Sequence, residues 1–153
     1  MNRQPAIAAA LVAIALCAGP LASAPALAQQ GPACNETNHC VDVTVVGGKI
    51  QPLPDVTVSG KNHQIWWQLK TPGYSFPKPP KSDGVAFKPA NSGNDNGRMP
   101  AKEFNCNRVS ATVFHCTDAN STNGQRRKYQ YGVTVVDDAS GKDITLDPWV
   151  VNL

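Results

Sequence analysis

The sequence predicts an all-β fold, a two-sheet antiparallel sandwich of seven to nine short strands with long loops rich in Pro, Gly and Asn. Three observations support this prediction. Several short segments alternate apolar and polar residues, as half-buried strands do. Clusters of Gly, Pro, Asn and Asp interrupt the chain at short intervals. No stretch repeats apolar residues at helical spacing over three turns, so no helix is expected.

The first 28 residues have the features of a cleaved export signal. Arg3 supplies a positive start, residues 6–18 are nearly all aliphatic, and Ala26-Leu27-Ala28 is a small-x-small cleavage pattern. We therefore expect cleavage near Ala28, a single β-sandwich domain over residues 29–153, and a periplasmic or secreted protein. The apolar run is too short for a comfortable membrane span, so no stable membrane insertion is expected.

The charge of the chain gives no argument for a nucleic-acid partner. The formal net charge is +3, and loss of Arg3 with the signal lowers it to +2. A value so close to neutral is not typical of proteins that bind nucleic acid or an anionic membrane surface.

Four cysteines remain after the predicted cleavage, and an even count in an exported chain indicates two disulfides. Three pairings are open. We favour Cys34–Cys40 and Cys106–Cys116, because the partners are close in sequence and turn-forming residues separate them. A disulfide that joins one sheet to the other is the alternative. The spacings do not match the C-x-x-C pairs of a structural zinc site.

The first third of the mature chain contains three predicted strands. Valines alternate with polar residues over residues 41–45, and Gly47-Gly48 then turns the chain. Residues 55–59 repeat the alternation, and a turn at residues 60–62 leads into a strand over residues 63–70. In this strand Trp67 shares a face with other apolar residues, so we expect it in the core between the sheets.

The middle of the chain is irregular. Residues 71–80 contain four prolines, and we expect no strand pairing there because proline donates no backbone hydrogen bond. A short strand is expected at residues 84–88, and residues 91–97 form a polar loop by composition.

Regular alternation returns in the last third. A strand near residues 102–106, a tight turn at Asn107-Arg108 and a strand over residues 109–116 form a hairpin that would bring Cys106 and Cys116 close together. Then follow the strongest predicted strand, which carries Tyr129, Tyr131, Val133 and Val135 on one face, a short strand at residues 143–146, and the terminal segment at residues 147–151.

Three resemblances follow from these patterns. The order Cys, Trp on a middle strand, Cys resembles an immunoglobulin-like domain, although the cysteines form two close pairs and no Tyr lies two residues before Cys116. The strand order and the His115-Cys116 pair resemble a cupredoxin scaffold. No His follows Cys116 and Met99 precedes it, so the ligand set of a type 1 copper site is incomplete.

The third resemblance covers about the last fifth of the chain. The segments YQYGVTVVDD and LDPWVVNL resemble the C-terminal hairpin of small uncharacterised exported bacterial β-sandwich proteins. This resemblance implies a fold and an exported location, and it implies no activity.

An aromatic surface is the main candidate for function. Trp66 points away from Trp67, and Tyr74 and Phe76 follow in the proline-rich loop. Exposed aromatic side chains in a stiff loop are typical of contact sites for a protein, a peptide or a glycan. We therefore predict a non-enzymatic binding module with Trp66, Tyr74 and Phe76 as contact residues. In the alternative, the loop folds over the strand and both of its faces are buried.

Two other classes of function are alternatives. A metal site on a cupredoxin-like scaffold would use His63 and His115 if they lay on neighbouring strands, but the favoured prediction has no cofactor and no metal. For an enzyme we find no G-x-S-x-G element and no pattern of Ser, His and Asp, so no catalytic residues are assigned.

Overall fold

The computed structural model describes residues 33–79, 83–88, 102–121 and 124–153. The predicted export signal and the predicted loop at residues 91–97 lie outside these ranges. The described residues form twelve strands and no helix. The strands are β1 (Asn38–Val43), β2 (Val45–Val46), β3 (Lys49–Ile50), β4 (Val56–Val58), β5 (His63–Leu69), β6 (Tyr74–Ser75), β7 (Val85–Phe87), β8 (Phe104–Arg108), β9 (Val113–Asp118), β10 (Arg127–Asp137), β11 (Asp143–Leu146) and β12 (Trp149–Asn152).

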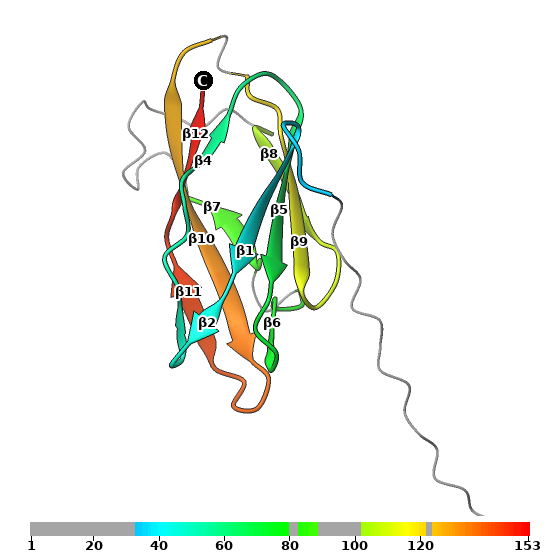
Figure 1. Cartoon of the computed structure of the whole chain (residues 1–153), viewed down its shortest axis with the longest axis vertical. Coiled ribbons are helices and arrows are strands. Elements are labelled where there is room, and N and C mark those ends of the chain that lie inside the picture. The colour runs from blue at the N-terminus through cyan, green and yellow to red at the C-terminus, as the bar shows by residue number, and fades with distance from the viewer. Residues whose placement is uncertain (1–32, 80–82, 89–101, 122–123) are drawn as a thin grey trace, which may run out of the picture.

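The all-β prediction is confirmed, and the strands form two larger sheets and one small hairpin (Figure 1). The first sheet has the order β1-β5-β9-β8, and the second contains β11, β10, β12 and β4 with β6 and β7 also paired to β10. The strands outnumber the predicted seven to nine because β2, β3 and β6 are only two residues long.

Two strand pairs depart from the predicted antiparallel arrangement. β1 pairs with β5 in parallel, and β12 pairs with β4 in parallel. In each case several elements intervene in the chain between the two partners, so no hairpin turn forces them to run in opposite directions. β1 and β4 each stand at an end of the strand order of their sheet.

The long strand β10 organises the second sheet. Along one side it pairs first with β12 and then with β11, and along the other side with β7 and then β6. Its alternate residues Tyr129, Tyr131, Val133 and Val135 are all buried, as the sequence pattern predicts.

The inner faces of both larger sheets share one hydrophobic core. Trp67 from β5 is 0% exposed, and its indole Nε1 donates to the Tyr131 hydroxyl of β10 over 3.3 Å. The two rings meet edge to face with centroids 5.3 Å apart. The prediction that Trp67 is a core residue between the sheets is therefore confirmed.

Two local predictions need correction. A two-residue strand, β6, does form in the proline-rich segment, because Tyr74 and Ser75 lie between Pro72 and Pro77 and keep their backbone N–H groups. The turn of the β8–β9 hairpin lies beyond Asn107-Arg108, where the backbone N–H of Val109 donates to the Val113 carbonyl.

The disulfide predictions agree with the structure. Cys34 bonds to Cys40, and Cys106 bonds to Cys116, its direct cross-strand partner. The 106–116 pairing itself sets the centre of the hairpin at residue 111, which explains the displaced turn. Two intramolecular disulfides are consistent with an oxidising compartment. Across the described ranges no helix is long and apolar enough to cross a membrane.

Candidate functional site: the outer face of the first sheet

The strand β5 separates an apolar inner face from a polar outer face. On the inner face Ile65, Trp67 and Leu69 are buried, whereas Gln64, Trp66 and Gln68 on the outer face are partly exposed. The alternation of the sequence thus produces a face on which a single indole lies between two amide side chains.

Strand pairing extends this face across the whole sheet. In register, Trp66 lies opposite Cys40 of β1 on one side and His115 of β9 on the other, and His115 lies opposite Asn107 of β8. The Trp66 and His115 rings lie against each other with centroids 4.1 Å apart and planes tilted by 33°. We call the outer-face residues Gln64, Trp66, Gln68, Asn107, His115 and Thr117 the Trp66 face.

Hydrogen bonds hold the side chains around Trp66. His115 Nε2 is bonded to Gln64 Oε1, which also accepts from the Thr117 hydroxyl over 3.0 Å, and His115 Nδ1 lies 3.3 Å from Asn107 Oδ1. Burial lowers the pKa of His115, so its ring is neutral near pH 7 and carries one N–H. The proton is placed on Nε2, because the Gln64 Oε1 that faces it can only accept a hydrogen bond. Nδ1 is then an acceptor, and the Asn107 amide donates to it when its NH2 group is turned toward the ring.

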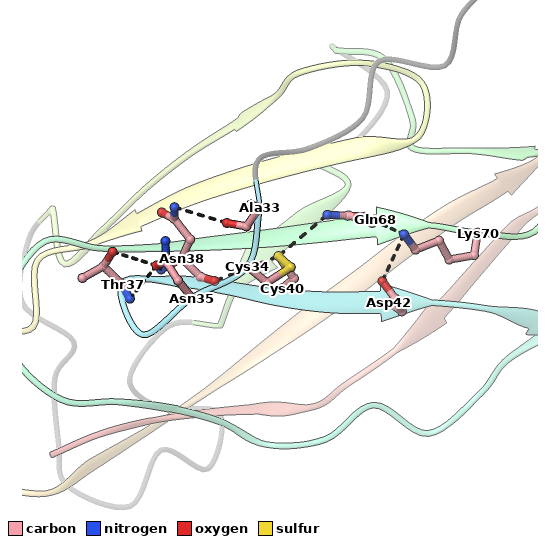
Figure 2. Close-up of a disulfide and its surroundings, with 9 residues drawn as sticks. All are labelled: Ala33, Cys34, Asn35, Thr37, Asn38, Cys40, Asp42, Gln68 and Lys70. Atoms are coloured by element: carbon pink, nitrogen blue, oxygen red, sulfur yellow. Dashed lines mark hydrogen bonds and ion pairs between the residues drawn. A yellow bond between two sulfur atoms is a disulfide. The ribbon is translucent and has the colours of Figure 1, made fainter.

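A second set of contacts ties the other end of the face to the first disulfide. Gln68 Nε2 lies 3.7 Å from the Cys40 sulfur, and Lys70 Nζ reaches both Gln68 Oε1 and the Asp42 carboxylate, the latter at 3.3 Å (Figure 2). Lys70 and Asp42 balance each other, so this part of the face has no net charge. Amide groups and one aromatic ring therefore dominate its chemistry.

A hollow of about 340 Å³ lies at the end strand β8 of the first sheet, mostly on its inner side, because Cys106, Arg108 and Phe114 have inner-face parity. Its lining residues are Pro77, Pro79, Asp83, Cys106, Asn107, Arg108 and Phe114. Asn107 belongs both to this hollow and to the Trp66 face. The proline-rich segment thus contributes Pro77 and Pro79 to this hollow, and its aromatic residues do not lie on the Trp66 face.

The indole nitrogen of Trp66 has an unusual environment. It is buried, and no residue in the described part of the chain accepts its hydrogen bond. An unpaired buried N–H costs about 1–3 kcal/mol. The indole is therefore held by ring contacts, and carbon atoms of the ring form its accessible part.

The other two predicted contact residues lie elsewhere. Tyr74 belongs to the second sheet through its pairing with Asp137 of β10. Phe76 is 1% exposed and packs against Phe114 in the core. Of the three predicted aromatic residues only Trp66 lies on the outer face of the first sheet.

The predicted histidine pair is also separated. His63 lies on the inner face of β5, the same face as the core residues of that strand. His115 lies opposite Trp66 on the outer face. His63 instead meets His39 of β1, with His39 Nε2 and His63 Nδ1 3.2 Å apart. Burial and the nearby His63 lower the pKa of His39. Among the described residues no group of three or more His, Cys, Asp or Glu is placed to hold a metal ion.

A buried polar cluster lies between the ends of β9 and β12. The Asn152 amide donates to Glu103 over 3.0 Å and to Asp118 over 3.1 Å, and the Ser121 backbone N–H also donates to Glu103. Desolvation raises the pKa of Asp118 to about 6, despite lowering by hydrogen bonds from Asn120 and Asn152. Asp118, Asn152 and Glu103 are at most 1% exposed, so this cluster is closed to a substrate.

Comparison with known proteins adds no relative. No family model matches the chain, and the curated proteins contain no match. The geometry of the Trp66 face is therefore the main indication of function.

Sequence reasoning missed five of the six residues of this face: Gln64, Gln68, Asn107, His115 (considered only as a metal ligand) and Thr117. The alternation in β5 places Gln68 on the face of Trp66, and the same rule extends to Gln64, although neither was predicted as a contact residue. Asn107, His115 and Thr117 could not be assigned to this face, because β5 and β9 are far apart in sequence and no local pattern gives the register between them.

Proposed function

We propose that the chain is an exported, non-enzymatic binding module that uses the Trp66 face to hold a glycan. The observation that carries this proposal is the partly exposed Trp66 ring with amide, imidazole and hydroxyl side chains around it. Sugar rings offer C–H groups that pack on an aromatic ring and hydroxyl groups that exchange hydrogen bonds with amides.

The character of the face favours a glycan over a protein partner. Protein interfaces have cores enriched in large apolar and aromatic residues. Among the described residues only Val46 and Leu153 are large hydrophobic side chains with high exposure, and neither belongs to the Trp66 face. The Lys70–Asp42 pair also balances its own charge, so a strongly charged peptide finds no complementary patch there.

The Trp66 face itself gives a ligand room to extend beyond one sugar ring. The face runs from Trp66 on β5 through His115 on β9 to Asn107 on β8. A chain of two or more sugar units is the size of ligand that this surface suits.

Affinity electrophoresis through gels that contain soluble polysaccharides, together with a glycan array, tests the proposal. We expect the wild-type protein to be retained by at least one glycan and Trp66→Ala to lose that retention. Trp149→Ala is the matched control, because Trp149 is a partly exposed indole on the second sheet, beneath Lys128. Its retention should equal that of the wild type.

Two outcomes contradict the proposal. One is a wild-type protein that no glycan retains, and the other is a Trp66→Ala variant, folded by circular dichroism, that is retained like the wild type. Capture of a peptide or protein through Trp66 in place of a glycan would also overturn the assignment of ligand class.

A further inference from the structure

Two histidines from different strands meet at one end of the first sheet. His39 lies on β1 opposite Ile65, and His63 opens β5 two positions earlier, so both side chains have the parity of the inner face. Their ring centroids are 5.3 Å apart with planes tilted by 30°, and His39 Nε2 lies 3.2 Å from His63 Nδ1. The parallel pairing of β1 with β5 therefore creates a pair of imidazoles from residues 24 apart in sequence.

The distance between the two nitrogens suits two ligands of one metal ion. Zinc and similar ions bind imidazole nitrogen at about 2.0–2.1 Å, and tetrahedral geometry then separates two nitrogens by roughly 3.3–3.4 Å. The observed 3.2 Å is also the length of a hydrogen bond between the rings. A metal ion bound by both nitrogens would replace the proton of that bond.

The surroundings leave room for further ligands. His39 lines a hollow of about 250 Å³ together with Asp55, the Cys34–Cys40 disulfide and part of β4. A side chain on Gly60 would place its Cβ 3.2 Å from His63 Nε2, so the glycine leaves this ring its space. Water molecules in the hollow can complete the coordination of an ion held by two imidazoles.

Two carboxylates lie on the elements around the pair. Asp118 is the cross-strand partner of His63 and is completely buried, and its Oδ2 has no hydrogen-bond partner in the described ranges. Asp55 in the hollow lies 3.8 Å from Lys128, its ion-pair partner. All four cysteines of the described chain are in disulfides, so thiolates do not compete for the metal.

We propose that His39 and His63 form an open two-histidine site for a divalent transition metal. Imidazole suits zinc, copper and nickel, and the general order of affinities places Cu²⁺ first. The site is separate from the Trp66 face, because these two side chains point to the inner side of the sheet and Trp66 to the outer side. The proposal therefore stands or falls independently of glycan binding.

Titration of the protein with Cu²⁺ and Zn²⁺ tests the site. The protein is purified without a polyhistidine tag and studied near neutral pH by isothermal titration calorimetry and by electron paramagnetic resonance. We expect one Cu²⁺ per chain, tighter than Zn²⁺, with hyperfine splitting from two nitrogens. His39→Gln and His63→Gln should each weaken Cu²⁺ binding at least ten-fold and leave one coordinated nitrogen.

The third histidine provides the matched control. His115 lies on the outer face, bonded to Gln64, so His115→Gln should bind Cu²⁺ like the wild type. Equal binding by all variants, or loss only in His115→Gln, overturns the proposal. If a glutamine variant fails to fold, the wild-type spectrum decides, because fewer than two coordinated nitrogens also overturns it.

Discussion

Trp66 and Trp67 are neighbours in sequence, yet their indole side chains have opposite environments because they lie on opposite faces of β5. Trp67 is 0% exposed, and its Nε1 donates to the Tyr131 hydroxyl. Trp66 is partly exposed, and its buried Nε1 finds no acceptor in the described chain. The polar atom of the Trp67 indole thus has a partner, as most buried polar atoms do, whereas that of the Trp66 indole has none among the described residues.

The largest expected effect comes from truncation of the inner indole. Trp67→Ala should lower the free energy of unfolding by about 3–5 kcal/mol, since it opens a cavity between the sheets and removes the donor to Tyr131. Trp66→Ala should cost clearly less, because its ring is already partly in solvent. Urea unfolding of both variants measures the difference, and equal losses would contradict the assignment of the two faces.

A buried carboxyl at the end of β9 tests how the inner face tolerates charge. The folded pKa of Asp118 is about 6 against an ordinary 3.8, so the folded state binds more protons than the unfolded state between these values. The contribution of Asp118 to the free energy of unfolding is favourable below pH 4 and is lost as the pH rises through about 6. Asp118→Asn should remove that slope and raise the stability at pH 7 relative to the wild type, on the order of 2–3 kcal/mol.

The control for Asp118 is a carboxyl with the opposite shift. Hydrogen bonds from the backbone N–H groups of Ala139 and Ser140 lower the pKa of the exposed Asp137. Its contribution is present at neutral pH and is lost as the pH falls, so Asp137→Asn should change the slope in the other direction. Unfolding midpoints measured across this pH range compare both variants with the wild type. If the difference in unfolding midpoint between Asp118→Asn and the wild type does not change with pH, the prediction is contradicted.

Local pattern was enough to predict much of the fold. Alternation placed Trp67 and the tyrosines of β10 in the core, and short sequence separation favoured both disulfides. These features depend on residues within one strand or one hairpin, where the period of two and the length of the connection decide the geometry.

The candidate sites depend on contacts that no local pattern contains. Trp66 meets His115, and His39 meets His63, only because β5 pairs with β9 on one side and with β1 on the other. The parallel pairing of β1 joins residues separated by several other elements, and a shift of one residue would turn His39 to the opposite face. For the same reason the sequence paired His63 with His115, although the sheet separates them by face.

The same conservative substitution at both indoles gives the smallest and sharpest test of the comparison. Trp67→Phe leaves the buried Tyr131 hydroxyl without its donor and should cost about 1–3 kcal/mol. Trp66→Phe removes an N–H that has no acceptor among the described residues. The cost of burying that N–H is then recovered and offsets the lost ring contact, so the free energy of unfolding should change by less than about 0.5 kcal/mol. Urea midpoints of the two variants measure this difference. If Trp66→Phe costs as much as Trp67→Phe, then Trp66 Nε1 has a partner in the folded protein, and the outer face is part of the stabilising structure instead of a surface kept for a ligand.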